Sequence, residues 1–184
     1  MSIELILGPM FSGKTSELFR RLNRAKYTGQ STIVFKYIKD RRYLPANGPH
    51  GPYGLSRAVS HDLIQVNAVP INDFGELSEL PDADVIGIDE GQFIGGAPLF
   101  AMAAAEAGKR VIISALDSDF RMMPWKNIQR LIPVSEQIDK LHAVCFKCKR
   151  DASFTKRLDS DNEAVEDIGG ADKYVASCRL CFFH

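Results

Sequence analysis

The sequence has no excess of charge of either sign and no long hydrophobic run. Its 184 residues include 23 Lys and Arg and 23 Asp and Glu, so the formal net charge is zero. Without a block of basic residues, nucleic acid is not expected as a partner. An apolar stretch of about 18 residues, the minimum for a membrane-spanning helix, is also missing, and segment 1–10 holds no basic stretch typical of a signal peptide. We therefore expect a cytoplasmic protein with no membrane partner.

Cysteine is also scarce, and its arrangement favours a metal site. The cysteines form two C-x-x-C pairs, Cys145 with Cys148 and Cys178 with Cys181. Cytoplasmic thiols stay reduced, and thiolates at this spacing hold one tetrahedral Zn²⁺, whereas a thioredoxin-like redox motif normally occurs singly. We predict a structural Zn²⁺ bound by all four, with a redox pair as the competing interpretation. Segment 149–177 exceeds the ~15–20 residues of a simple zinc ribbon, so we expect it to contain an inserted lid (lasso) loop.

Segment 8–15, GPMFSGKT, fits G-x-x-x-x-G-K-[ST] at every fixed position. An apolar run precedes it and a helix-forming pattern begins just after Lys14, which is the strand, loop and helix context that the motif requires. Glycines let backbone N–H groups surround a phosphate, the lysine reaches the outer phosphates, and the Thr15 hydroxyl can ligand Mg²⁺. A glycine-rich turn with an exposed lysine is the less favoured alternative. The predicted phosphate-binding residues are Gly8, Pro9, Met10, Phe11, Ser12, Gly13, Lys14 and Thr15.

Apolar runs alternate with helix-forming segments before the first cysteine pair. The expected strands lie at 3–7, 31–37, 84–93 and 110–120, and an alanine-rich helix is expected over 97–108. This alternation predicts an α/β fold, a P-loop (RecA-like) parallel sheet flanked by helices. Beyond about Leu141 the pattern changes to short segments. We place a P-loop α/β nucleotide-binding domain at 1–141 and a small zinc-ribbon-like domain with a substrate-covering loop at 142–184.

Two carboxylates, Asp89 and Glu90, follow the buried run VIGI. Open α/β sheets bind ligands at the carboxyl ends of their strands, so both side chains are expected beside the phosphate loop. Asp89 is placed like the acidic residue that holds Mg²⁺ in P-loop proteins. Glu90 could position a water in a nucleotide hydrolase or accept the proton of a substrate hydroxyl in a kinase, and the motif does not distinguish the two. A solvated strand end is a third, weaker interpretation.

Several motifs extend in order over nearly the whole chain: LILGPMFSGKTSEL, KYIKDRRY, VIGIDEGQF, ALDSDF, AVCFKCKRDASFTKR and IGGADKYVASCRLC. Together they resemble the cellular-type (type II, zinc-containing) thymidine kinases. The resemblance implies Mg²⁺-dependent transfer of the ATP γ-phosphate to the 5'-hydroxyl of deoxythymidine, giving dTMP in pyrimidine deoxynucleoside salvage. It also implies activity on deoxyuridine, feedback inhibition by dTTP and a homotetramer. An ATP-driven nucleic-acid-binding protein with a zinc ribbon is the alternative, disfavoured by the zero net charge and single tryptophan.

The same resemblance implies roles for individual residues. Glu90 becomes the general base for the 5'-hydroxyl. The nucleotide and metal surroundings are completed by Asp40, Arg42, Asp89 and Gln92. The nucleoside pocket is implied to be lined by Met10, Phe93, Leu116, Phe120, Thr155, Arg157, Val165, Ile168, Gly169 and Tyr174, with backbone groups of lid residues 165–169 pairing with thymine. Apolar residues of this set could instead be ordinary core, and the arginines surface charges. Trp125 and Asp167 depart from the pattern of the relatives.

Overall fold

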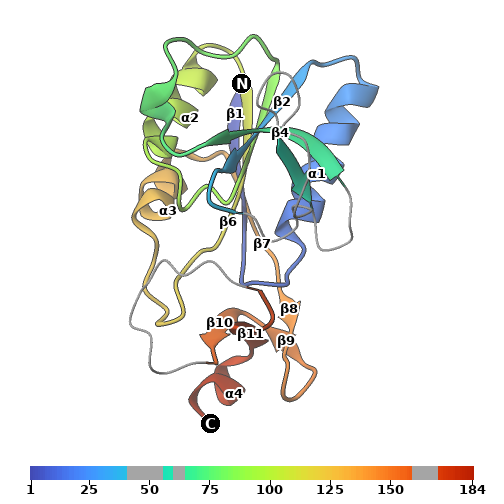
Figure 1. Cartoon of the computed structure of the whole chain (residues 1–184), viewed down its shortest axis with the longest axis vertical. Helices are drawn as coiled ribbons and strands as arrows, with labels where there is room; N and C mark the ends of the chain where they lie inside the picture. Colours follow the sequence, from blue (N-terminus) through green and yellow to red (C-terminus); the bar gives the residue numbers. More distant parts are fainter. Residues whose placement is uncertain (41–55, 60–64, 159–169) are drawn as a thin grey trace.

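The computed structural model describes residues 1–40, 56–59, 65–158 and 170–184, with only the backbone described for 56–59 and Gln65. Strands and helices alternate along most of the chain (Figure 1). The strands of the main sheet are β1 (Ser2–Leu7), β2 (Thr32–Tyr37), β3 (Ser56–Val59), β4 (Gln65–Ile71), β5 (Val85–Asp89), β6 (Arg110–Ala115) and β7 (Gln137–Lys140). The helices beside it are α1 (Lys14–Tyr27), α2 (Ala97–Glu106) and α3 (Lys126–Leu131), with short 3-10 turns η1 (Phe74–Glu76) and η2 (Ile132–Val134).

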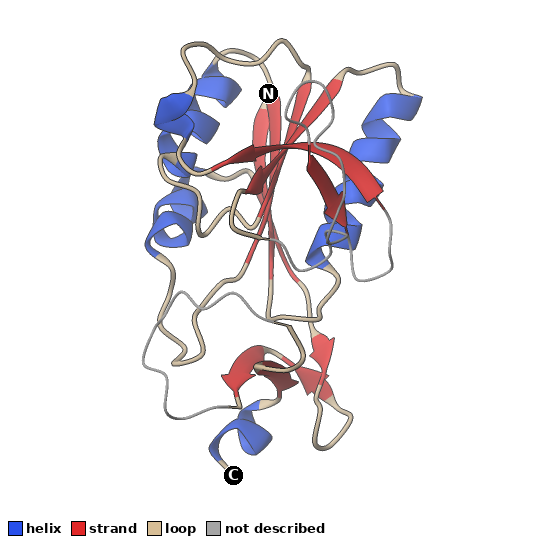
Figure 2. Ribbon diagram, viewed as in Figure 1, coloured by secondary structure: helices blue, strands red, loops and turns tan. Residues whose placement is uncertain are grey.

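Within the described residues, one sheet has the strand order β3-β4-β2-β5-β6-β1-β7. All neighbouring strands are parallel except β3, which runs antiparallel to β4. Helix α1 covers one face, and α2 and α3 cover the other (Figure 2). The predicted α/β parallel sheet flanked by helices is therefore confirmed, and the structure adds β3, β4 and β7 to the strands expected from the sequence.

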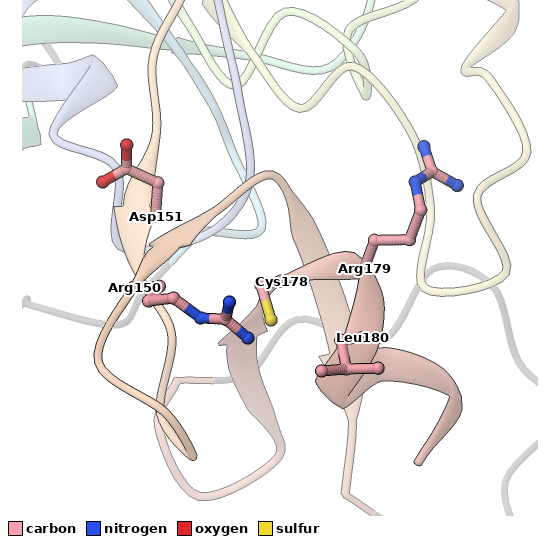
Figure 3. A pocket seen from close by; sticks show the side chains of 5 residues that line it. All are labelled: Arg150, Asp151, Cys178, Arg179 and Leu180. Atoms are coloured by element: carbon pink, nitrogen blue, oxygen red, sulfur yellow. The ribbon is translucent and has the colours of Figure 1, made fainter.

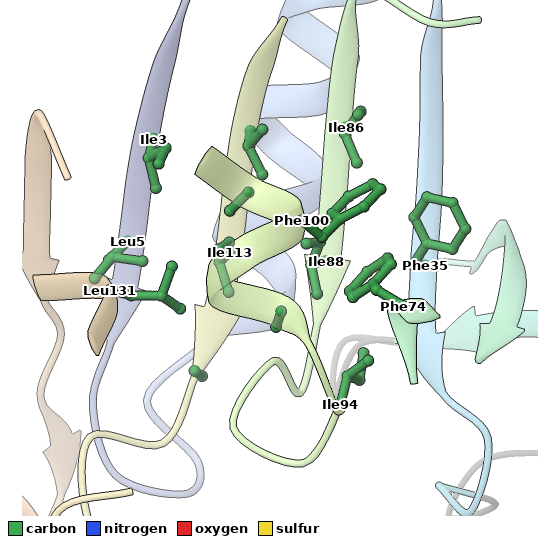
Figure 4. Packing of buried hydrophobic residues seen from close by; sticks show 14 of the residues in the cluster. Ile3, Leu5, Phe35, Phe74, Ile86, Ile88, Ile94, Phe100, Ile113 and Leu131 are labelled. Carbon is green, nitrogen blue, oxygen red and sulfur yellow. The ribbon is translucent and has the colours of Figure 1, made fainter. Parts of the chain in front are cut away.

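Alternation of side chains along the strands fills a core on each face of the sheet. In β1, Leu5 joins the cluster under α2 and α3, whereas Ile6 joins the cluster under α1. On the α2 side, Phe74 and Phe100 stack with ring centroids 3.9 Å apart, and Phe35 meets both edge-on (Figure 4). Each such buried side chain stabilises the fold by about 1.5–3 kcal/mol relative to exposure. These two cores fix the positions of the strand ends.

An ion network around the buried Arg21 ties α1 to the sheet. Arg21 donates to Glu4 on β1 (3.0 Å), Glu17 (2.8 Å) and Asp139 on β7 (2.7 Å). Glu17 also accepts from Arg20, and these arginine contacts lower its pKa to about 2, with the Arg20 hydrogen bond as the largest cause. The network fixes α1 against β1 and β7. The phosphate-binding segment begins at the end of β1.

The segments after Leu141 form a separate group of small elements below the main sheet in Figure 1. They are β8 (Ala143–Val144), β9 (Asp151–Ala152), β10 (Phe154–Arg157), β11 (Tyr174–Ser177) and α4 (Arg179–Phe183). Strand β8 pairs with β9 and β10 with β11, both antiparallel. We call this group the cysteine module, because its core contains Cys145 and Cys181. The predicted domain boundary near Leu141 stays a prediction.

Candidate functional site

The segment between β1 and α1 forms a tight loop at the carboxyl edge of the sheet. Phe11 (φ 66) and Gly13 (φ 80) both have left-handed backbone, which turns the chain sharply before α1. The Ser12 hydroxyl donates to the Pro9 carbonyl at 2.8 Å, and the Lys14 ammonium donates to the same oxygen at 2.7 Å. Successive backbone N–H groups in such a turn, together with the start of a 14-residue helix, form an anion-binding concavity.

Asp89, at the end of β5, lies beside this loop. Its Oδ1 accepts hydrogen bonds from the Thr15 hydroxyl at 3.0 Å and from the Ser114 hydroxyl at 2.5 Å. The predicted Mg²⁺ ligands Thr15 and Asp89 are therefore neighbours, and their hydroxyl and carboxylate oxygens are the donors that Mg²⁺ prefers. Sequence reasoning missed Ser114, although a serine inside the apolar run VIISA was a usable signal.

Glu90 has an unusual backbone conformation, with φ 56 in the left-handed region. A non-glycine residue there is strained, and such strain is concentrated at functional sites. The Gln92 amide donates to Glu90 Oε2 at 2.5 Å and accepts from the Leu116 N–H at 3.1 Å. Gln92, which is 5% exposed, thus holds the Glu90 carboxylate against the end of β6. Its predicted contact to the nucleotide stays a prediction.

Predicted nucleoside-pocket residues gather where the cysteine module meets the sheet. The Arg157 guanidinium lies 4.1 Å from the Phe120 ring centroid and donates to the Tyr174 hydroxyl at 2.6 Å. The Thr155 hydroxyl accepts from the Met10 N–H at 3.0 Å. Pairing of β10 with β11 brings Arg157 opposite Tyr174. The module therefore contacts the phosphate loop through Thr155, and Arg157 joins Phe120 to Tyr174.

Phe93, which follows β5, is the centre of a cluster of aromatic rings. Phe93 meets Trp125 edge-on with ring centroids 5.0 Å apart, and Tyr37 lies 5.3 Å from Phe93. Trp125 packs against Phe93 at the edge of the α2-side core. Asp40 lies just after β2, where the Lys36 ammonium donates to its carbonyl at 3.2 Å. Four predicted site residues lie outside the described residues: Arg42, Val165, Ile168 and Gly169.

The four cysteines converge as predicted. All four Sγ atoms lie within 4.8 Å of one another, and those of Cys148 and Cys178 are 3.6 Å apart. Sulfurs bound at ~2.3 Å to one tetrahedral Zn²⁺ would be ~3.8 Å apart, so this donor set fits a structural zinc. Backbone N–H groups of Cys148 and Cys178 lower the pKa of Cys145 to about 5, which favours the ligating thiolate. Burial raises the pKa of another of the four thiols, Cys181, to about 12.

A shallow pocket of about 630 Å³ adjoins the cysteines (Figure 3). It is lined by Arg150, Asp151, Cys178, Arg179 and Leu180. The Arg150 guanidinium points toward the cysteines and lowers the pKa of Cys148, whereas Arg179 lies 4.8 Å from the Phe154 ring. Arg150 therefore offsets the negative charge of the thiolates.

Over the described part of the chain, no helix combines the length and apolar character needed to span a membrane.

The chain is similar to known proteins over nearly its whole length. A family model described as "Thymidine kinase" matches residues 1–182. The cytosolic thymidine kinase of Homo sapiens is 45% identical over 184 residues, covering 98% of this chain and 73% of the human protein. The thymidine kinase of Myxoma virus (strain Lausanne) is 43% identical over 182 residues, covering 98% of this chain and 96% of the viral protein. That of Fowlpox virus (strain NVSL) is 41% identical over 185 residues, covering 99% and 97%.

Proposed function

This chain belongs to the thymidine kinase family of ATP-dependent phosphotransferases, and from this premise we propose that it moves the γ-phosphate of ATP to the 5'-hydroxyl of deoxythymidine. The observation that supports the proposal best is that Thr15 and Asp89 share a hydrogen bond beside the phosphate loop, with Glu90 next in sequence. The residues proposed for phosphate binding, for Mg²⁺ and for the general base thus lie at one edge of the sheet.

The phosphate end of the site is segment 8–15, supplemented by Asp40 and Arg42. Backbone N–H groups of the loop and the start of α1 would bind the phosphate oxygens. Lys14 lies over the loop, 2.7 Å from the Pro9 carbonyl, from which its flexible side chain can turn to the outer phosphates. Thr15 and Asp89 would hold Mg²⁺, which neutralises the charge that develops on the transferred phosphoryl group.

Glu90 is the proposed general base. Its carboxylate accepts the proton of the 5'-hydroxyl while that oxygen forms a bond to the γ-phosphorus and the bond from phosphorus to the leaving ADP breaks. Gln92 donates to Glu90 Oε2, and this hydrogen bond fixes the direction of the carboxylate. The strained backbone of Glu90 is consistent with a side chain held in one direction for catalysis.

The nucleoside is proposed to bind between the aromatic cluster around Phe93 and the side chains of the cysteine module near Phe120. The described members of this pocket are Met10, Phe93, Leu116, Phe120, Thr155, Arg157 and Tyr174, and Val165, Ile168 and Gly169 belong to the proposed lid. A pocket for one methyl group discriminates by only ~1–3 kcal/mol, so deoxyuridine is also a proposed substrate. The zinc at Cys145, Cys148, Cys178 and Cys181 is structural in this scheme, because all four ligand positions are protein thiolates.

Further properties are proposed from the family and from the sequence pattern. These are a homotetramer, inhibition by dTTP, a cytoplasmic location like that named for the human relative, and a division into domains at 1–141 and 142–184. Light scattering at micromolar concentration tests the first, since a monomeric mass would contradict it. Steady-state inhibition by dTTP competitive with deoxythymidine tests the second.

The central experiment is phosphate transfer from ATP to a panel of nucleosides with and without Mg²⁺, with products identified by mass. We expect dTMP and dUMP, each only with Mg²⁺, and little product from purine deoxynucleosides. ATP hydrolysis without a phosphorylated nucleoside would contradict the kinase. The alternative of a nucleic-acid-stimulated ATPase would then be tested by adding DNA in place of nucleoside.

A further inference from the structure

The phosphate-binding loop is in direct contact with the cysteine module. The Met10 N–H donates to the Thr155 hydroxyl at 3.0 Å, across 145 positions of sequence, and this hydrogen bond is buried. Thr155 is 5% exposed and lies on β10. Thus one backbone N–H of the loop is satisfied by a side chain of the module, and losing that acceptor would leave it buried without this partner.

Phe11 provides a second and independent contact. Its backbone is left-handed (φ 66), a conformation that favours glycine and is strained for an aromatic residue. Its side chain packs against the core of the cysteine module, which consists of Ala143, Cys145, Ala152, Ala176 and Cys181. Partial burial of the aromatic ring against this cluster offsets the backbone strain, which is a reason for phenylalanine at this position.

The start of the loop is enclosed by the chain that leads into the module. The Leu141 N–H donates to the Leu7 carbonyl at 2.8 Å. A Cβ on Gly8 would lie only 2.6 Å from the Leu141 carbonyl oxygen, so a glycine is needed for this close approach. The loop is therefore held at its start, at Met10 and at Phe11 by residues 141 onward.

We propose that the cysteine module braces the phosphate-binding loop, with Phe11 and Thr155 as positioning residues that couple metal binding at the cysteines to nucleotide binding at the loop. Two of the metal ligands, Cys145 and Cys181, belong to the apolar cluster that Phe11 touches. Zinc fixes those cysteines and thereby the surface that holds Phe11. Coupling of this kind is reciprocal, so nucleotide tightens zinc binding by the factor by which zinc tightens nucleotide binding. The inference rests on the proposed ATP site at segment 8–15.

The first test measures ADP binding with Mg²⁺ by calorimetry in the absence of nucleoside, so that the proposed nucleoside contact of Thr155 does not contribute. Phe11→Ala and Thr155→Val should each weaken ADP binding about tenfold, as expected for loss of packing or of one buried acceptor. Phe11→Leu and Thr155→Ser keep the packing or the hydroxyl and should restore most of the affinity. Phe146→Ala is the matched control, because Phe146 lies in the same module and is 66% exposed.

The second test measures zinc affinity by competition with a chelator, with and without saturating ADP. In the wild-type protein and in Phe146→Ala, ADP should raise zinc affinity, and in Phe11→Ala and Thr155→Val the increase should fall toward unity. Unchanged zinc affinity in a wild-type protein that binds ADP would overturn the proposal, as would wild-type ADP affinity in both loop variants. If the protein shows this coupling but forms no dTMP, the proposed contact between module and loop stands and the proposed kinase activity is refuted. The two hypotheses can therefore fail separately.

Discussion

Replacing Ser114 with alanine should weaken the proposed magnesium site far more than it weakens the fold. The Ser114 side chain is buried, and its hydroxyl donates to Asp89 Oδ1 at 2.5 Å. The same oxygen accepts from Thr15 at 3.0 Å. Alanine removes the shorter of these two hydrogen bonds while leaving the strand pairing of β6 with β5 intact. Asp89 then loses a group that fixes the direction of its carboxylate.

The expected magnitude follows from the charge of the acceptor. A hydrogen bond to an ionised group contributes about 1.5–3 kcal/mol, and the single hydroxyl leaves only a small cavity. A loss of about 1.5 kcal/mol in the transition state lowers kcat/KM for MgATP about tenfold. Steady-state kinetics across a series of free Mg²⁺ concentrations should show half-saturation shifted upward by a similar factor.

A matched control separates this effect from general destabilisation. Ser135→Ala also removes one serine hydroxyl, which donates to the Leu131 carbonyl at 2.7 Å beyond α3. We expect wild-type Mg²⁺ dependence for Ser135→Ala. If Ser114→Ala has the same Mg²⁺ dependence as the wild type, or if its activity falls only with the folded fraction measured by circular dichroism, the reasoning about Asp89 is refuted.

Three further predictions concern the base, the zinc and acid stability. Glu90→Gln should lower kcat at least about a hundredfold while ADP affinity stays near the wild-type value, since only the proton acceptor is lost; loss of ADP binding would contradict the assignment. Cys145→Ser should lower the zinc-to-protein ratio measured by atomic absorption, and an unchanged ratio would show this thiol to be dispensable. Glu17 has a folded pKa of about 2, below its usual 4.5, so its contribution is complete above pH 4.5 and is lost as the pH falls toward 2. In urea unfolding at neutral pH, Glu17→Gln should therefore have a free energy of unfolding about 1–2 kcal/mol below that of the wild type, a value reduced because Arg20 is exposed to solvent. This difference should shrink in acid. A difference that does not depend on pH would exclude an ionic origin.

Contiguous patterns in the sequence were sufficient to predict the phosphate loop and the four central strands of the sheet, β2, β5, β6 and β1. Buried strands such as β5 are continuous apolar runs, and the loop motif includes its own flanking strand and helix. Strands β4 and β7 could not be predicted in this way. β4 (QVNAVPI) contains Asn67 and Pro70, and β7 (QIDK) is short and mostly exposed, so the partners they meet in the sheet, not their composition, make them strands.

Predicting the site from the sequence succeeded where motifs mark the residues and failed for contacts that no motif marks. Thr15, Asp89 and the four cysteines were predicted, and the structure brings the first two together and the cysteines together. The hydrogen bond from Met10 to Thr155 joins residues 145 positions apart, and no periodicity encodes such a contact. The left-handed backbone of Glu90 and Phe11 was equally inaccessible, because propensity favours glycine there.

Ser114 contacts the proposed metal site and the segment of the proposed base through different groups. Its side chain donates to Asp89, whereas its backbone carbonyl accepts from the Gly91 N–H at 3.1 Å, next to the strained Glu90. Alanine at this position deletes the first contact and keeps the second, and Gln92 still holds the Glu90 carboxylate. Ser114→Ala should therefore leave the KM for deoxythymidine and the acidic limb of the pH–rate profile unchanged while Mg²⁺ dependence shifts. A parallel change in both would mean that Asp89 and Glu90 are positioned as one unit and not by separate contacts.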